Sequence, residues 1–260
     1  MYELLDKLKE NAGETGIITD VDGTISEIVD ESTGEHATVD AEFQELLERL
    51  VDTYKVAGVV TGRDMTSVRR MLDIPGLFYS ASHGLEQFQS GSYYCKLEGS
   101  ELAQAFSHLE ESIPKELRSI LYLERKTLSR GLHFRNCVGQ HPEIAVEVDK
   151  KVKRFAYEMA EKYGLNVQGG RMVYELKPAD EDKGTAINSL VARFDLKSLM
   201  YAGDDLTDIR AFDEVHKHNG ITIGVYDPND PERVDEIREK SDIQVASVLD
   251  MKKVLRYLVT

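Results

Sequence analysis

The chain has 260 residues, of which 41% are hydrophobic and 30% charged, and its formal net charge is −15. This composition is typical of a globular protein that can bury a sizeable core. The acidity argues against a nucleic acid partner, because proteins meet phosphate backbones with basic patches. No apolar run approaches the length of about 18 residues that spans a membrane, and the charged N-terminal segment has no signal-peptide core. We therefore expect a cytoplasmic protein with neither a nucleic acid nor a membrane partner.

The two cysteines, Cys95 and Cys137, have a spacing that matches no metal site. We interpret them as thiols in a reducing compartment, and the sequence leaves open whether they pair. A chain this acidic repels an anionic substrate at long range. The site for such a substrate should therefore contain a cation or local basic side chains.

Strand and helix signals alternate through the first third of the chain. The expected elements, in chain order, are a helix over 2–12, a strand that runs into Asp20, a loop over 25–38, a helix from Asp40, a strand over 55–61, a helix that ends before Pro75 and a strand over 77–81. This alternation predicts a parallel sheet with right-handed crossovers.

The pattern changes after residue 86, and residues 87–100 predict a hairpin or a linker. The elements expected next are helices over 102–109 and 142–163 and strands over 121–126, 131–136, 165–167 and 172–177. Short alternating strands of this kind predict an α+β insert over residues 98–178, within a core domain formed by residues 1–97 and 179–260.

The strand–helix alternation returns after Pro178. The expected elements are a helix over 185–194, a strand over 199–202, a helix to about 215, a strand over 220–225, an acidic loop over 227–241 and a helix from 248. The end of the chain is thus predicted to complete the same α/β core.

Polar side chains follow three of the predicted core strands. Asp20 and Asp22 follow the first, Thr61 follows the second, and Asp204 and Asp205 follow the strand that precedes them. The carboxyl ends of parallel strands meet at one edge of a sheet, so these groups are expected to converge. Four carboxylates in one place cannot all ionise without a cation. Hard oxygen ligands favour Mg²⁺, which would also attract a phosphorylated substrate.

Two further groups suit phosphoryl transfer. The hydroxyl of Thr61 and the ammonium of Lys183 would neutralise phosphoryl oxygens and hold the group in line. Each signal alone has an ordinary explanation, because an Asp-Asp pair before a helix is often an N-cap and a single lysine is usually solvated. Their occurrence in one ordered set favours chemistry on a phosphorylated small molecule.

The haloacid dehalogenase superfamily of phosphatases has four motifs that resemble, in order, Asp20-Val-Asp22-Gly-Thr24, Thr61, Lys183 and Gly203-Asp204-Asp205-Leu-Thr-Asp208. The resemblance implies a Rossmann-like α/β core with a parallel sheet. It also implies that Asp20 is a nucleophile that forms an aspartyl-phosphate, and that Asp22 is the general acid and base. Thr61 and Lys183 would bind the phosphoryl group.

The same resemblance implies a magnesium cofactor. Its ligands would be Asp20, the backbone carbonyl of Asp22, and Asp204. Asp205 and Asp208 would orient these ligands.

The insert resembles the C2-type cap, or lid, of this superfamily, and its motifs are similar to those of trehalose-6-phosphate phosphatases. The similar segments are Glu124-Arg-Lys126-Thr-Leu-Ser129, His133-Phe-Arg135, Glu175-Leu-Lys177-Pro178 and, upstream, Ser82-His83-Gly84-Leu-Glu86. The resemblance implies that Lys126, Ser129 and Glu175 hydrogen-bond sugar hydroxyls. The further candidate substrate contacts are Gly62, Arg63, His83, Gly84, His133 and Arg135.

Alternation along a strand predicts that His133 and Arg135 share one face, and that Glu175 and Lys177 share one face. A sheet with one apolar and one charged face would serve as a lid over a site. A half-solvated antiparallel sheet shows the same alternation. His83 is either a substrate contact or a structural histidine in a loop.

The resulting hypothesis is a Mg²⁺-dependent phosphatase that acts on trehalose 6-phosphate. One alternative is a phosphatase for another sugar phosphate, such as sucrose phosphate or a glucosyl- or mannosyl-phosphoglycerate. A second alternative is a non-catalytic sugar-phosphate sensor, although a sensor has no need of a nucleophile. We expect a monomer, and a trehalose-phosphate synthase is a candidate partner.

Overall fold

The computed structural model describes residues 2–29, 36–95, 100–170, 172–178, 182–229 and 234–260. The chain divides into two compact units, a core unit of Met1–Lys96 with Glu181–Thr260 and an insert unit of Leu97–Asp180. Parts of the loops expected over 25–38 and 227–241, and of the hairpin or linker expected over 87–100, lie outside the described residues. None of the described helices combines the length and apolar composition needed to cross a lipid bilayer.

The core unit is built on one large sheet. Its strands are β1 (Thr15–Thr19), β2 (Val56–Val60), β3 (Phe78–Ala81), β4 (Glu86–Gln89), β5 (Ser92–Cys95), β10 (Ser198–Gly203), β11 (Ile221–Val225) and β12 (Ile243–Val245). They lie in the order β12-β11-β10-β1-β2-β3-β4-β5. Strands β12 to β3 pair in parallel, and β4 and β5 form an antiparallel hairpin at one edge. The α/β class predicted from the alternation of elements is confirmed.

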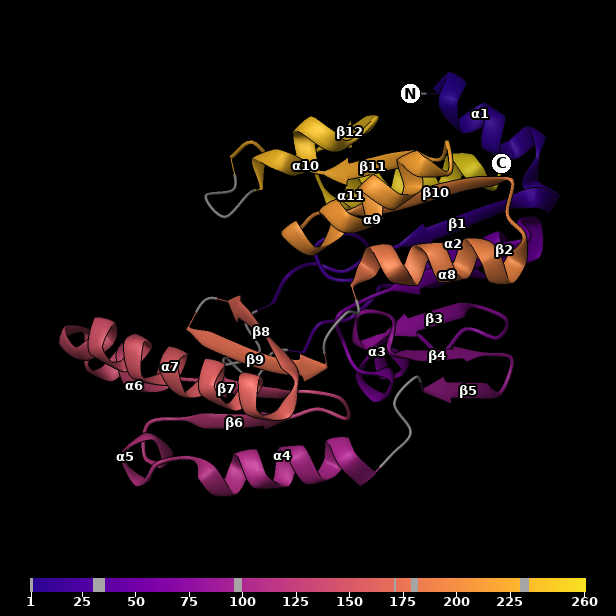
Figure 1. Cartoon of the computed structure of the whole chain (residues 1–260). Helices are drawn as coiled ribbons and strands as arrows, with labels where there is room; N and C mark the ends of the chain where they lie inside the picture. Colours follow the sequence, from indigo (N-terminus) through magenta and orange to yellow (C-terminus); the bar gives the residue numbers. More distant parts are fainter. Residues whose placement is uncertain (1, 30–35, 96–99, 171, 179–181, 230–233) are drawn as a thin grey trace. The chain divides into compact units, whose positions relative to one another are not determined.

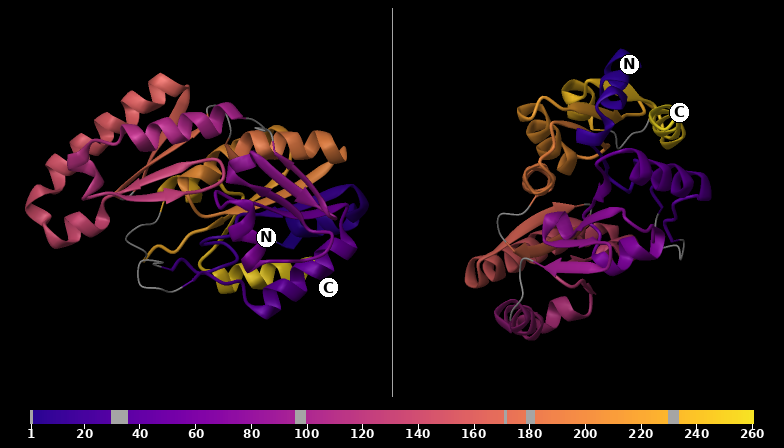
Figure 2. Two further views of the ribbon diagram at one scale, coloured as in Figure 1. Left: turned by 90° about the horizontal axis from the view of Figure 1, so that it is seen from below. Right: turned by 90° about the vertical axis from the view of Figure 1, so that its right-hand side faces the viewer.

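Helices cover both faces of this sheet (Figures 1 and 2). They are α1 (Tyr2–Glu10), α2 (Ala41–Thr53), α3 (Met65–Met71), α8 (Lys183–Phe194), α9 (Leu206–Lys217), α10 (Asp235–Lys240) and α11 (Val248–Leu258). Neighbouring residues of β1 enter opposite cores, since Ile17 packs with α1, α2 and α11 while Ile18 packs with α8 and α9. Burial on both faces explains why Ile17 and Ile18 are both apolar, without the alternation of a half-exposed strand.

Local signals set where the core helices begin. Asp40 accepts a hydrogen bond from the backbone N–H of Phe43 at 3.0 Å and caps α2, as its position before the leucine-rich segment predicts. Phe43, Leu46 and Leu50 recur at helical spacing and are buried against the sheet.

The insert unit is a smaller α+β structure. Its elements are α4 (Ser100–Ser112), α5 (Lys115–Arg118), β6 (Tyr122–Arg125), β7 (Arg130–His133), α6 (Arg135–Gln140), a 3₁₀ turn η4 (Pro142–Ile144), α7 (Ala145–Tyr163), β8 (Leu165–Gly170) and β9 (Val173–Pro178). The strands form an antiparallel sheet in the order β6-β7-β9-β8. Leu132 and Leu176 on one face pack with Phe106 of α4 and Phe155 of α7, and Figure 2 shows both helices on that side.

Some element boundaries differ from the expectations. The strand expected over 131–136 ends at His133, and Arg135 begins α6, because the backbone turns at Phe134 (φ −127°, ψ 10°). The prediction that His133 and Arg135 share a strand face is therefore wrong. The acidic segment expected as a loop over 227–241 contains α10 in its described part. A hairpin or a linker was expected after residue 86, and the described part of this segment forms a hairpin of the short strands β4 and β5.

Candidate active site

Three strand ends come together at one edge of the core sheet. Strand β1 pairs in parallel with both β2 and β10, so the residues that follow these strands are neighbours. Asp20 follows β1 and its backbone N–H donates to the carbonyl of Ala202 in β10 at 2.8 Å. Thr61 follows β2 and Asp204 follows β10. The convergence of these side chains, expected from the sequence, therefore follows from the parallel pairing of β1 with β2 and β10.

A buried lysine lies among the carboxylates at this edge. Lys183, the first residue of α8, places its Nζ 3.0 Å from Oδ1 of Asp20 and 2.7 Å from Oδ1 of Asp208. Its side chain is 3% exposed. Burial alone would lower the pKa of Lys183, but the carboxylates of Asp20 and Asp208 raise it above its ordinary value. Lys183 therefore carries a positive charge beside Asp20.

Asp208 is fully buried and uses both of its carboxylate oxygens. Oδ1 accepts hydrogen bonds from Lys183 and, at 2.5 Å, from the hydroxyl of Tyr201. Oδ2 accepts the backbone N–H groups of Asp204 and Asp205 at 3.1 and 3.0 Å. These contacts fix the loop after β10 and the position of the lysine at the same time.

The carboxylates of Asp20, Asp204 and Asp208 each offer an oxygen within 4.8 Å of the others. Burial raises the pKa of Asp20 to about 7, against the attraction of Lys183. Burial, reinforced by Asp20 and Asp208, raises the pKa of Asp204 to about 9. Carboxylates that are this costly to ionise, with oxygen as the donor atom, suit a hard divalent cation. The residues present therefore fit Mg²⁺.

The turn after Asp22 is shaped to receive Asp204. Gly23 has φ +71°, and a Cβ atom there would lie 2.0 Å from Oδ2 of Asp204. Thr24 donates its hydroxyl to Oδ1 of Asp204 at 3.2 Å. Residue 23 must adopt a positive φ and leave room for the carboxylate of Asp204, and only glycine does both. This gives a physical reason for the Asp-Gly-Thr sequence.

Asp22 lies beside Arg63 in a bidentate ion pair. Arg63 donates Nε to Oδ2 and Nη2 to Oδ1 of Asp22, each at 2.7 Å. The backbone N–H of Arg63 donates to the hydroxyl oxygen of Thr61 at 3.2 Å. The turn over residues 61–63 therefore holds the side chain of Asp22 in place.

His83 and Gly84 lie against this same turn, in the 3₁₀ turn η3 (Ser82–Gly84). The backbone N–H of His83 donates to the carbonyl of Thr61 at 3.0 Å. His83 is buried, and a Cβ atom at Gly62 would lie 2.8 Å from its ring. His83 and Gly84 both have positive φ, and Glu86 accepts a hydrogen bond from Ser82 at 2.6 Å. The backbone of His83 is thus fixed to the turn over residues 61–63, and its ring lies beside Gly62.

Asp205 has a different position from its neighbours. Its side chain is exposed, accepts the N–H of Leu206 at 2.6 Å and caps α9. The N-cap explanation considered for the Asp-Asp pair is therefore correct for Asp205. Asp204 and Asp205 both border a hollow of about 470 Å³, which Gly23, Tyr226 and Ser247 also line.

The insert unit has a polar cluster of its own. Glu175 of β9 accepts hydrogen bonds at the same oxygen, Oε1, from Lys126 Nζ at 3.0 Å and Ser129 Oγ at 2.5 Å. Glu124 of β6 contacts Nε2 of His133 at 3.0 Å and Lys126 Nζ at 3.6 Å. Burial alone would lower the pKa of Lys126, but Glu175 and Glu124 raise it. The hydrogen bond with His133 lowers the pKa of Glu124.

The sugar-contact candidates of the insert thus fall into two groups. Lys126, Ser129, His133 and Glu175 join in this cluster, whereas Arg135 is exposed at the start of α6. The cluster is a set of charged donors and acceptors of the kind that recognises hydroxyl groups.

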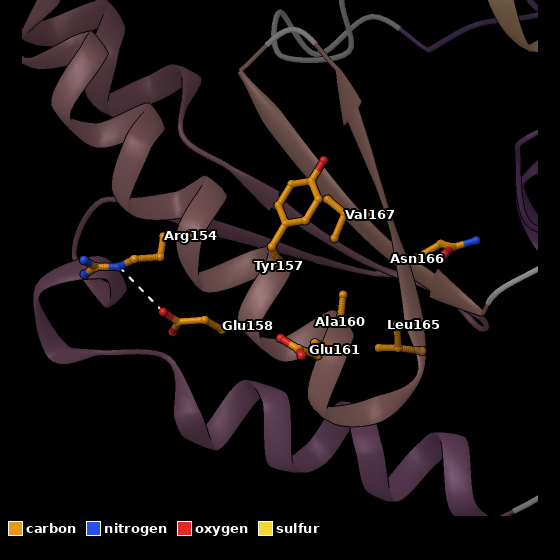
Figure 3. Close-up of a pocket in the computed structure, with 8 residues that line it drawn as sticks. All are labelled: Arg154, Tyr157, Glu158, Ala160, Glu161, Leu165, Asn166 and Val167. Atoms are coloured by element: carbon orange, nitrogen blue, oxygen red, sulfur yellow. Dashed lines mark ion pairs between the residues drawn. The ribbon is translucent and has the colours of Figure 1, made fainter.

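A pocket of about 480 Å³ lies between α7 and β8 of the insert unit (Figure 3). Its polar side chains lie at the surface, where Arg154 and Glu158 form an exposed ion pair at 3.8 Å and Tyr157 is half exposed. The polar groups of this pocket therefore face solvent, whereas Lys126, Ser129 and Glu175 are largely shielded from it.

The sequence assigned no role to three residues that contact these groups, although Thr24 and Glu124 lie within the matching motifs. Tyr201 and Thr24 bond to Asp208 and Asp204, and Glu124 completes the insert cluster. A tyrosine within a buried strand needs a partner for its hydroxyl, which is the signal that could have identified Tyr201.

The comparisons with known proteins agree with this arrangement. A family model described as trehalose-phosphatase matches residues 18–242. The chain is 33% identical over 254 residues to a trehalose-phosphate phosphatase of Mycobacterium marinum, covering 90% of this chain and 61% of that protein. It is 31% identical over 224 residues to an uncharacterized glycosyl hydrolase of Mycobacterium tuberculosis, covering 80% of this chain and 16% of that protein. The chain therefore spans less than two thirds of the length of either relative.

A solved structure, the C-terminal domain of a C. albicans trehalose-6-phosphate phosphatase, matches the fold with a TM-score of 0.71 at 18% identity. The match covers 99% of this chain and 96% of that one. Fold and site define an α/β protein of the haloacid dehalogenase type. Because the family model matches most of the chain, the chain belongs to the trehalose-phosphatase family, and the resemblance read from its motifs is confirmed.

Proposed function

We propose that the protein is a Mg²⁺-dependent phosphatase that hydrolyses trehalose 6-phosphate to trehalose and phosphate. The observation that carries the proposal is the buried Lys183 between Asp20 and Asp208, at an edge where Asp204 also lies. This arrangement holds a carboxylate beside a fixed positive charge, as attack on a phosphoryl group requires.

In the first step, a carboxylate oxygen of Asp20 attacks phosphorus while the bond from phosphorus to the sugar oxygen breaks. Lys183 and the Thr61 hydroxyl hold the phosphoryl oxygens and neutralise their charge. Asp22 gives a proton to the leaving sugar oxygen, for which it must exchange its contact with Arg63 for one with the substrate.

In the second step, water attacks the phosphorus of the aspartyl-phosphate. Asp22 takes the proton from that water, inorganic phosphate leaves, and the carboxylate of Asp20 is restored. Asp208 keeps Lys183 and the loop after β10 in position throughout.

Asp20 and Asp204 would hold the magnesium ion, together with the backbone carbonyl of Asp22. When bound, the ion supplies positive charge that ionises the carboxylates and stabilises the negative charge of the transferred group. Asp208 has both oxygens engaged by protein donors, which supports an orienting role outside the ligand set.

Sugar recognition falls to the insert unit in this proposal. Lys126, Ser129 and Glu175 supply two donors and an acceptor for sugar hydroxyls, and His133 with Glu124 extends the set. We also propose that Arg63, His83, Gly62, Gly84 and Arg135 contact the substrate, and that the insert acts as a cap that excludes water when it closes. A monomeric state and a trehalose-phosphate synthase as partner stay predictions.

The test is phosphate release from a panel of sugar phosphates, with Mg²⁺ and with EDTA. The proposal expects trehalose 6-phosphate to be the best substrate and EDTA to abolish turnover. Equal rates on monosaccharide phosphates would favour a broader sugar-phosphate phosphatase. Binding of sugar phosphates without any release of phosphate would favour the sensor alternative.

A further inference from the structure

The turn between β6 and β7 carries Lys126 and Ser129, the two side chains that donate hydrogen bonds to Glu175 within the described part of the chain. Within this turn, the backbone N–H of Lys126 donates to the carbonyl of Ser129 at 3.2 Å. The side chains of the same two residues both reach Oε1 of Glu175. The geometry of this cluster therefore depends on how firmly the turn over residues 126–129 is closed.

Arg130 lies just after this turn, on the opposite face of the sheet from the cluster. Along β7 it alternates with Gly131 and shares its face with Leu132, which is buried against the helices. Its guanidinium carbon lies 4.3 Å from the centre of the Phe106 ring in α4. Its Nε donates to Oε1 of Glu110 in the same helix at 2.7 Å.

From this position Arg130 holds both ends of the turn. Its Nη1 donates to the carbonyl of Lys126 at 2.7 Å and to the carbonyl of Ser129 at 2.8 Å. Its side chain is 15% exposed. Charged donors shielded from water make stronger hydrogen bonds than neutral ones. One guanidinium thus links helix α4 to the two backbone carbonyls that define the turn.

We propose that Arg130 is a positioning residue for substrate recognition: it closes the turn that presents Lys126 and Ser129 to the sugar. That the turn meets a sugar rests on the proposed function. That Arg130 closes the turn rests on its two hydrogen bonds to the carbonyls of Lys126 and Ser129. Arg130 acts through the backbone of the turn and contacts no substrate itself.

Arg125 provides a matched control. It lies opposite Arg130 on β6 and reaches Oε2 of the same Glu110 at 2.8 Å, but its side chain is 61% exposed. Arg125→Met removes one of the two positive charges that pair with Glu110. It leaves both carbonyl contacts of Arg130 in place.

The first measurement is amide hydrogen exchange on the full chain, which needs no substrate. We expect Arg130→Met to speed exchange of the Lys126 amide by about tenfold or more, because local opening of the turn becomes easier. Arg130→Lys keeps the charge but loses the planar fork, so it should show a smaller increase, and Arg125→Met should match the wild type. Unchanged exchange in both Arg130 variants, or an equal increase in Arg125→Met, would overturn the proposal.

The second measurement compares trehalose 6-phosphate with para-nitrophenyl phosphate, which has no sugar. We expect Arg130→Met to raise the KM for trehalose 6-phosphate by about tenfold, because Lys126 and Ser129 are no longer held in the position that meets the sugar. Its kcat/KM for para-nitrophenyl phosphate should change by less than about twofold. Equal losses on both substrates would assign Arg130 a general structural role and overturn the inference. A wild-type chain that hydrolyses only para-nitrophenyl phosphate would overturn the proposed substrate, while the exchange result still decides the role of Arg130 in the turn.

Discussion

The ammonium of Lys183 lies 3.0 Å from a carboxylate oxygen of Asp20, and neither side chain is more than 7% exposed. The two residues are far apart in the sequence and meet because α8 begins beside the carboxyl end of β1. A charge pair buried this deeply depends on both partners, since removal of one leaves the other without compensation.

Replacement of Lys183 by methionine should therefore destabilise the protein. We expect the free energy of unfolding in EDTA to fall by about 3 kcal/mol, because Asp20 and Asp208 lose their shared cation. Denaturation by urea gives the measurement. Lys217→Met, at an exposed lysine that pairs with Glu214, is the control and should cost less than about 1 kcal/mol. A loss for Lys183→Met as small as that of the control would contradict this account of the pair.

The raised pKa values of Asp20, to about 7, and Asp204, to about 9, predict how stability depends on pH without metal. A carboxyl group with a raised pKa keeps its proton in the folded protein after the unfolded chain has released it. Rising pH then favours the unfolded chain until the folded group also ionises. The Tm in EDTA should accordingly fall between about pH 6 and about pH 9.

Magnesium should reverse this effect, because its charge replaces the protons on these carboxylates. We expect the rise in Tm on addition of Mg²⁺ to be larger at about pH 9 than at about pH 6. Thermal denaturation with Mg²⁺ and with EDTA at both pH values provides the test. A rise that is equal at the two pH values, or smaller at the higher one, would show that these carboxylates do not bind the ion.

The turn at Gly23 gives a third prediction. In Gly23→Ala the added methyl group would overlap Oδ2 of Asp204, and the backbone would keep a φ that alanine disfavours. We expect a loss of about 1–3 kcal/mol in stability and a weaker response of Tm to Mg²⁺. Gly13→Ala, where an added Cβ meets nothing within 4 Å, is the matched control. A Gly23→Ala protein that binds Mg²⁺ like the control would contradict the proposed fit between Gly23 and Asp204.

The insert cluster gives a fourth prediction. Glu175→Gln keeps the shape of the side chain but removes the charge that Lys126 and Ser129 both contact. We expect its KM for trehalose 6-phosphate to rise by about tenfold or more, with little effect on para-nitrophenyl phosphate. Glu158→Gln, on the exposed face of α7, should leave both substrates unaffected. Equal effects on the two substrates would remove the cluster from sugar recognition.

The sequence predicted those features of the site that follow from the sheet itself. Asp20, Thr61 and Asp204 each end an apolar run, and parallel pairing of adjacent strands brings such ends together whatever the details of packing. The class of fold followed from the same alternation of strands and helices.

Features that depend on contacts between distant side chains could not be read in this way. In the sequence Tyr201 is an ordinary strand residue, and only the structure shows that its hydroxyl donates to Asp208. Arg130 likewise resembles a surface arginine, and only the structure shows that it bonds to the backbone of the turn. Arg135 was misplaced because nothing in the local alternation indicates that the backbone turns at Phe134.

Trapping of the aspartyl-phosphate would show whether Asp20 itself accepts the phosphoryl group. Wild-type protein, mixed with trehalose 6-phosphate labelled in its phosphorus and quenched in acid within one turnover, should carry the label on the peptide that contains Asp20. Asp20→Asn should carry none and release no phosphate, while Asp52→Asn, at an exposed carboxylate, should behave as the wild type does. Phosphate release by Asp20→Asn at a rate near that of the wild type would show that Asp20 is not the nucleophile.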